Sequence, residues 1–400
     1  MRIGLFISGK LASTGGAFTF ESQLLQAILE LAPMARHTFV FCTDDQNISR
    51  DKLNLSLETI SFYQSPKFKT LETLKAIFRK LRYPRSKFEI QGIGEKHILK
   101  LLNTQKIDLN LFLGWPKTAI VDVPYITIVW DLQHRLQPYF PEVSRCREWD
   151  YREDFYSKIL RRATFIITGT KTGKSEIQRF YHISSERIKV VPFFTPQLKL
   201  SSCSEREILN KYNIPNQYLF YPAQFWPHKN HIGLLLAVKT LREKYALDLP
   251  LVLVGSDKGN KSYVETMARE LDLSSQVHFL GFVPQEDMAP LYSNAFALTF
   301  TTFFGPDNLP PLEAMSLGCP VIASNVPGAK EQLGDGALLV DPKKPEEIAG
   351  AIKLLWEDGN FRQDLIKKGL ARSQKWTVQD YAQKIFSIID EFEAVRRCWS

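Results

Sequence analysis

TTFFGPDNLPPLEAMSLGCPVIASNVPG, residues 301–328, is the stretch that best indicates how this 400-residue chain folds. A loop over 305–308 leads into a predicted helix that opens with Pro310 and Pro311, and a β-branched run follows the helix. Proline suits the first helical positions because its missing N–H would have no partner there. The unpaired N–H groups and the positive dipole end of such a helix favour a phosphate.

Glu313 stands in the first turn of the same predicted helix. A carboxylate does not bind phosphate, but it can accept hydrogen bonds from the diol of a ribose. A site that binds both phosphate and ribose is a nucleotide site. The residues alone leave a second interpretation open, an ordinary loop–helix–strand unit of an α/β protein, because helix-start signals are common.

Strand-like and helix-like patterns alternate along the chain in two successive series. Strands are predicted at 2–8, 37–43, 108–113, 125–130, 164–168 and 189–192, and then at 218–222, 251–255, 277–281, 295–301, 320–323 and 337–340. Helical patterns lie between them, for example over 18–31, 234–245 and 263–271. This alternation is typical of βαβ units with parallel sheets, so two series predict two Rossmann-like, doubly wound α/β domains.

The length of the chain agrees with two domains, because 400 residues exceed what one ordinary core holds. The break is expected where the sequence turns to Thr, Pro, Gln and Ser, so that one domain spans 1–195 and the other 196–375. Residues 376–400 contain a last predicted helix.

Composition limits where the protein works. The apolar runs are too short to cross a membrane, and the N-terminus lacks the apolar core and cleavage site of a secretory signal. Five scattered cysteines form no paired motif, which argues against a disulfide framework or a zinc site. We therefore expect a cytoplasmic protein.

The charge is uneven. Residues 1–200 hold 30 Lys and Arg against 19 Asp and Glu, whereas residues 201–400 hold 21 against 24. Eight of the basic residues lie within 67–88, KFKTLETLKAIFRKLRYPRSKF, where apolar residues recur at helical spacing. This pattern predicts peripheral contact with an anionic membrane, at its inner face. The alternative is a helix that docks on its own domain.

The 301–328 stretch resembles the signature of retaining glycosyltransferases of family 4, which have the GT-B architecture of two Rossmann-like domains facing across a cleft. The resemblance implies that 1–195 binds the acceptor, that 196–375 binds the nucleotide-sugar donor, and that the helix in 376–400 crosses back to the N-terminal domain. The run GCPVIASNVPG over 318–328 also matches. Within the helix, the matching positions are Leu309, Pro310, Leu312, Glu313 and Ala314. The first glutamate of the family pattern, which contacts the donor sugar, is replaced by Gly305, as in a Gly-Pro-x-Asn-x-Pro-Pro-Leu-Glu form of the family.

The resemblance implies a set of donor-binding residues. Lys229, in YPAQFWPHKNH, matches a lysine that faces the donor pyrophosphate, while Gln224 replaces the family's arginine. The other implied donor-binding positions are Gly15 and Gly16 in the loop after the first strand, Gly255, Phe282 and Val283 at strand ends near the base, and the amides near Asn308 and Leu309. Without the resemblance, Lys229 would be a surface lysine and the glycines ordinary strand ends.

The stretch TIVWDLQHRLQPYFPE supplies candidates for the acceptor side. Asp131 follows an apolar strand, where open α/β sheets place ligand contacts, and His134 follows closely. The resemblance implies that either could orient the acceptor hydroxyl, although Trp130 replaces the usual histidine of the family. The alternative is that Asp131 caps a helix and His134 lies on the surface.

The resemblance implies a retaining glycosyltransferase that moves a sugar from a nucleotide diphosphate sugar to a glycan, lipid-linked or small-molecule acceptor. The expected mechanism needs no metal or other cofactor, because Lys229 and backbone amides would stabilise the leaving diphosphate. No nucleic-acid partner is expected. Gly305 and Gln224 leave a catalytically impaired, nucleotide-binding subunit as an alternative. A nicotinamide oxidoreductase is a weaker one, because no convincing Gly-x-Gly-x-x-Gly fingerprint is present.

Overall fold

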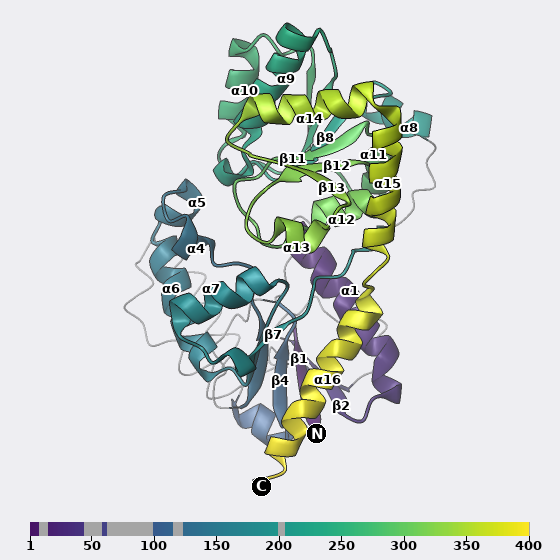
Figure 1. Ribbon diagram of the computed structural model, residues 1–400. Helices are drawn as coiled ribbons and strands as arrows, with labels where there is room; N and C mark the ends of the chain where they lie inside the picture. The colour runs from purple at the N-terminus through teal and green to yellow at the C-terminus, as the bar shows by residue number, and fades with distance from the viewer. Residues whose placement is uncertain (8–14, 44–57, 62–98, 115–122, 199–204, 400) are drawn as a thin grey trace.

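The computed structural model describes residues 1–7, 15–43, 58–61, 99–114, 123–198 and 205–399. They form two α/β domains, one above the other in Figure 1, each built around a parallel sheet. This confirms the predicted GT-B class of fold. Residues 67–88 lie outside the described part of the chain.

The N-terminal domain holds a seven-stranded sheet in the order β3-β2-β1-β4-β5-β6-β7. Every neighbouring pair is parallel, as in the register Ile3↔Phe39 between β1 and β2. Its strands are β1 (Arg2–Phe6), β2 (Thr38–Thr43), β3 (Glu58–Ser61), β4 (Leu109–Phe112), β5 (Tyr125–Ile128), β6 (Phe165–Thr168) and β7 (Ile188–Val190). Its helices are α1 (Gly16–Leu31), η2 (Ala32–Met34), α4 (Gln133–Leu136), α5 (Pro141–Ser144), α6 (Glu148–Arg162), α7 (Lys171–Tyr181) and η5 (Ser185–Arg187).

The C-terminal domain holds a six-stranded parallel sheet in the order β10-β9-β8-β11-β12-β13. Its strands are β8 (Leu219–Pro222), β9 (Leu251–Val254), β10 (Val277–Gly281), β11 (Ala297–Phe300), β12 (Val321–Ser324) and β13 (Ala337–Val340). Its helices are α8 (Glu205–Tyr212), η6 (Pro227–Lys229), α9 (His231–Tyr245), α10 (Lys261–Glu270), α11 (Gln285–Ser293), α12 (Leu309–Ser316), α13 (Ala329–Leu333), α14 (Pro345–Glu357) and α15 (Gly359–Ser373).

The apolar cores follow the two sheets. One cluster of buried side chains covers both faces of the C-terminal sheet, and two clusters cover the N-terminal sheet. Phe194 lies in an N-terminal cluster and Leu198 packs on the C-terminal one, so the chain passes between the domains at 195–197. β3 is the one described strand that the sequence did not predict.

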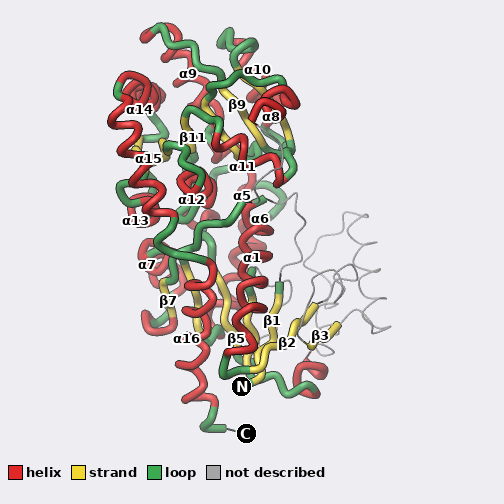
Figure 2. Tube along the Cα trace, turned by 90° about the vertical axis from the view of Figure 1, so that its right-hand side faces the viewer, coloured by secondary structure: helices red, strands yellow, loops and turns green. Residues whose placement is uncertain are grey.

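The last helix, α16 (Val378–Arg396), belongs to the core of the N-terminal domain. A capping box starts it, with Thr377 accepting from the Asp380 amide and Asp380 accepting from the Thr377 amide. It leaves α15 in the upper domain and runs down beside α1 (Figures 1 and 2). The chain therefore joins the domains twice. No helix of the described residues is both long and apolar enough to cross a membrane.

Candidate functional site

A cavity of about 270 Å³ lies between the two domains. We call its side from the C-terminal domain the C-wall; it consists of Trp226, His228, Lys229 and residues 304–308. The opposite side is the N-wall, made by Trp130, Asp131, Gln133, Glu142 and Arg152. Both walls include segments at the carboxyl ends of central strands, β8 and β11 on one side and β5 on the other. Open α/β sheets place their ligands at such ends.

Lys229 ends the short helix η6 and projects from the C-wall. The next residue fixes this turn: Asn230 takes a left-handed conformation, and its side chain caps α9 by accepting from the Gly233 amide at 3.1 Å. Burial lowers the pKa of Lys229 to about 8, while Asp131 and Glu142 oppose that shift. In the described part of the chain its ammonium has no ion pair, and it lies 5.2 Å from the centre of the Phe300 ring.

Asp131 lies on the N-wall immediately after β5. Its Oδ1 accepts from the amide of Gln133, the first residue of α4, at 2.9 Å. Arg152, from α6, lies on the same wall and donates to Glu148 at 2.9 Å. The negative charge of Asp131 helps to raise the pKa of Arg152 and opposes the lowering of that of Lys229. Asp131 therefore both accepts from the first amide of α4 and lines the cavity.

His134 does not line the cavity. Its side chain is fully buried, with Nε2 at 3.2 Å from Glu153 and 2.9 Å from the Tyr181 hydroxyl. The ring stacks on Tyr156, and burial lowers its pKa to about 4. Asp131 thus lines the cavity and His134 does not. The alternative prediction, that His134 lies on the surface, is also wrong, because its side chain is buried.

The loop over 304–308 is shaped by Gly305. Its φ is +133°, and a β-carbon there would lie 2.5 Å from the Asn308 side-chain amide. That amide donates to the Gly305 carbonyl at 2.8 Å. A glutamate at this position, as in the more common family pattern, would require a different loop. Gly305 is therefore part of an ordered loop whose shape depends on having no side chain.

The start of α12 offers fewer donors than the sequence suggested. The Asn308 amide donates to Gln332 at 3.0 Å, and Pro310 and Pro311 have no N–H. Leu309 is then the first residue of the helix whose amide can face a ligand. Its side chain packs on Gly16, which brings the glycine loop before α1 to this end of α12. Gly15, the N-cap of α1, adjoins this contact.

The predicted nucleotide-binding residues lie around β8, β9, β10 and α12. Gln224 donates to Ser256 at 3.3 Å and accepts from the Trp226 indole at 3.0 Å. Gly255 has φ +156° and packs against the Ala223 carbonyl, so packing between strand ends accounts for this glycine. After β10, the Phe282 side chain is 56% exposed, whereas Val283 is buried.

Glu313 is held by one of its two carboxylate oxygens. Oε2 accepts from the Tyr292 hydroxyl at 2.7 Å in the core of the C-terminal domain. Oε1 has no hydrogen bond within the described residues. Burial raises the pKa of this carboxyl group. The arrangement leaves one oxygen for a ligand and uses the other to orient the side chain.

The sequence missed an acidic group at the domain junction. Asp307 packs directly on Gly169 of the N-terminal domain, and a β-carbon at Gly169 would lie 2.5 Å from its carboxylate. Burial, and then the charges of Glu331 and Glu176, raise the pKa of Asp307 to about 8. Glu331 itself accepts from the Lys171 amide at 2.8 and 2.9 Å, at the start of α7. These contacts hold the two domains together beside the cavity.

The sequence also missed Glu142, His228 and Arg152 as cavity residues. His228 and Glu142 lie within the stretches that pointed to Lys229 and Asp131, but no pattern singles out these two residues, and they meet only because the domains face each other. Only the fold reveals them.

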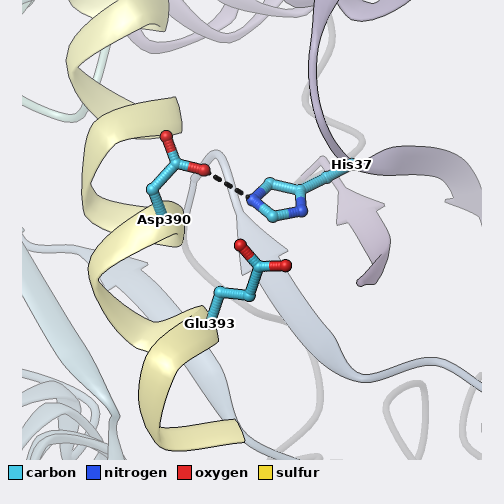
Figure 3. Close-up of side chains that lie close together, drawn as sticks. All are labelled: His37, Asp390 and Glu393. Carbon is cyan, nitrogen blue, oxygen red and sulfur yellow. Dashed lines mark hydrogen bonds and ion pairs between the residues drawn. The ribbon is translucent and has the colours of Figure 1, made fainter. Parts of the chain in front are cut away.

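A second cluster of potential ligands lies far from the cavity, at the far end of α16. His37, Asp390 and Glu393 approach one another there, as Figure 3 shows. Nε2 of His37 lies 2.9 Å from Asp390, and the N-terminal ammonium lies 3.3 Å from its Nδ1. Glu393 already pairs with Arg36 at 3.2 Å and with Arg397 at 2.9 Å. These cations satisfy the carboxylate, so we interpret the cluster as a tie between α16 and the start of β2.

Comparison with known proteins agrees with this geometry. Residues 204–372, within the C-terminal domain, match the family model of glycosyl transferases group 1. The chain is 29% identical over 230 residues to O-antigen chain mannosyltransferase B of Escherichia coli, covering 57% of this chain and 60% of that relative. It is 28% identical over 221 residues to O-antigen chain mannosyltransferase RfbU of Salmonella typhimurium, covering 55% and 58%. The matches thus span about three fifths of these relatives.

Solved structures match over almost the whole chain. A sucrose-phosphate synthase from Thermosynechococcus elongatus has a TM-score of 0.73 at 20% identity, covering 98% of this chain and 99% of the other. HepE of Anabaena, solved in complex with UDP and glucose, has a TM-score of 0.68 at 19% identity with the same coverage. The chain therefore has the GT-B fold.

Proposed function

We propose that this protein is a retaining glycosyltransferase of family 4 that moves a sugar from a nucleotide diphosphate sugar to a glycan or lipid-linked acceptor. The observation that carries the proposal is the position of Lys229. It is a partly buried ammonium on a cavity between two Rossmann-like domains, on the same wall as Asn308, the residue that precedes α12. Glu313 lies one turn further along that helix. A cation, a helix start and a ribose-binding carboxylate are what a nucleotide diphosphate requires.

In this proposal, negative charge develops on the diphosphate as the bond to the sugar breaks. Lys229 and the Leu309 amide would stabilise that charge in a site that closure shields from water. Asp131, on the opposite wall, would orient the acceptor hydroxyl, whose proton passes to the departing phosphate. Lys229 supplies the positive charge, so we propose that no metal takes part. His134 would act only indirectly, because its ring is buried and does not line the cavity.

The relatives named as mannosyltransferases make mannose our first choice of sugar. The test is turnover by the purified chain. Release of nucleotide diphosphate would be measured with GDP-mannose, UDP-glucose and other nucleotide sugars, with and without lipid-linked glycan acceptors. NMR of the product would show whether the anomeric configuration is kept, and EDTA should leave turnover unchanged. Binding that stabilises the protein against heat without any turnover would instead indicate a catalytically impaired subunit.

We also propose that the N-terminal domain works at the cytoplasmic face of an anionic membrane. The support is the sequence of residues 67–88, with eight basic residues against one acidic residue. Each basic residue near an anionic leaflet contributes about 1 kcal/mol. Sedimentation with vesicles should show binding only when anionic lipid is present, and salt should weaken it. Binding that survives replacement of Lys75, Arg79, Lys80 and Arg82 by Ser would contradict the proposal.

A further inference from the structure

The structure contains a carboxylate–imidazole pair that only the facing domains can form. Glu142 belongs to α5 of the N-terminal domain and His228 to η6 of the C-terminal domain, 86 residues later. Oε1 of Glu142 accepts from the backbone N–H of His228 at 3.2 Å and also contacts Nδ1 of its ring. Side-chain exposure is 4% for Glu142 and 12% for His228. Both residues line the cavity.

The contacts determine which ring nitrogen is free. A hydrogen bond to a carboxylate holds the proton on Nδ1, which leaves the lone pair of a neutral ring on Nε2. Burial, and then the charge of neighbouring Lys229, lower the pKa of His228, so its ring is neutral near pH 7. Among the described residues, Nε2 has no hydrogen-bond partner. It is thus an oriented acceptor on the wall of the cavity.

We infer that Nε2 of His228 accepts a hydrogen bond from a sugar hydroxyl in the closed site, with Glu142 as the residue that positions the ring. This inference rests on the proposed function. Nε2 faces the cavity, where a bound ligand can donate to it, and sugars carry several hydroxyl donors around the ring. Lys229, the next residue, faces the proposed diphosphate, so the hydroxyl belongs to a group within reach of the reacting bond.

The pair also links substrate contact to closure. Glu142 can hold the His228 ring only when the two domains approach each other, so the acceptor at Nε2 is oriented in the closed form and loses its support in an open one. Closure that completes a binding site in this way favours the correct substrate.

Two substitutions separate this role from a purely structural one. His228→Asn keeps a side-chain N–H near the position of Nδ1 but removes the Nε2 acceptor, whereas His228→Gln extends an amide toward the position of Nε2. If Nε2 contacts substrate, His228→Asn should lower kcat/KM by about five- to tenfold, the value of one hydrogen bond, and His228→Gln should retain more activity. If the pair only holds the domains together, the order reverses, and that result would overturn the inference. His182→Asn is the matched control, because His182 is exposed and left-handed at the end of α7.

Glu142→Gln gives an independent readout. The charged groups that face the His228 ring are Glu142 from α5, Lys229 from η6 and Asp131 from the loop after β5. The Glu142 carboxylate stabilises the protonated ring, so an amide there should move the acid fall of kcat/KM to lower pH. An unmoved acid limb would contradict the role of Glu142.

The source of the hydroxyl follows from two assays with GDP-mannose, or whichever donor the wild type uses. A donor hydroxyl predicts that His228→Asn also slows hydrolysis of the donor without acceptor. An acceptor hydroxyl predicts that hydrolysis is kept and only transfer falls. A wild-type protein that turns over no nucleotide sugar would instead refute the proposed function, and this inference with it.

Discussion

The two walls of the cavity differ in how their residues are supplied. The C-wall comes from two short segments next to β8 and β11, and both segments carry local sequence patterns that predict their role. The N-wall combines residues from the end of β5, from α5 and from α6. The C-wall presents Lys229 and Asp307, whereas the N-wall presents Asp131, Glu142 and Arg152. We infer that the C-wall handles the diphosphate, which all nucleotide sugars share, and that the N-wall determines which acceptor reacts.

The largest effect is expected on the C-wall, from Lys229→Ala. Loss of the cation should lower kcat by about 100-fold or more, the effect of removing one preorganised donor to a transition-state charge. The Michaelis constant for the donor should change less, because lost transition-state binding appears in turnover. Steady-state kinetics with the preferred nucleotide sugar measure both.

Lys258→Ala is the control, since Lys258 lies near Trp226 but does not line the cavity. A Lys229→Ala protein with unchanged kcat and a raised Michaelis constant would show that Lys229 only holds the donor. Normal kinetics in Lys229→Ala would show that Lys229 takes no part in binding the donor or in catalysis.

Glu313→Ala should weaken binding of a nucleotide diphosphate by roughly 1.5–3 kcal/mol, the range for hydrogen bonds to charged groups. Calorimetric titration measures this. Tyr292→Phe separates recognition from packing, because it removes the hydroxyl that holds Oε2 and leaves the carboxylate in place. Equal losses in both variants would mean that Glu313 acts through the core and not through the ribose.

Asp131→Asn tests the N-wall. It keeps an oxygen that can accept from the Gln133 amide, so α4 should still form. We expect transfer to the acceptor to fall by about tenfold, since a charged partner of the hydroxyl is lost. Binding of nucleotide diphosphate should change little. If Asp131→Asn weakened donor binding as much as it slowed transfer, the proposal that the N-wall serves the acceptor and the C-wall the donor would be wrong.

The fold and the C-wall could be predicted from the sequence because both depend on local sequence patterns. Alternating strands and helices predicted two parallel sheets, and the residues around Lys229 and Glu313 follow one another along the chain. The N-wall depends on tertiary contacts: Glu142 and Arg152 have no motif, and His134 is turned into the domain by Glu153 and Tyr181. At α12, the pattern correctly gave the helix start but not the Gln332 side chain that occupies the Asn308 amide.

The smallest effect is expected at Asp307, a C-wall residue that packs on Gly169 of the N-terminal domain. Burial raises its pKa to about 8, well above the usual value for an aspartate of about 4. The folded protein therefore holds a proton that the unfolded chain releases between those values, so this group makes the protein less stable as pH rises from about 4 to 8. Asp307→Asn should remove that loss and raise the thermal midpoint at pH 8 by about 2 °C, with no gain at pH 4. Burial also raises the pKa of Glu176, to about 7, so stability should still fall with rising pH in Asp307→Asn. Adding Glu176→Gln should make stability depend even less on pH. Thermal unfolding followed across this pH range decides the matter: if Asp307→Asn runs parallel to the wild type, the carboxyl is ionised in the folded protein and the N-terminal domain does not control its charge.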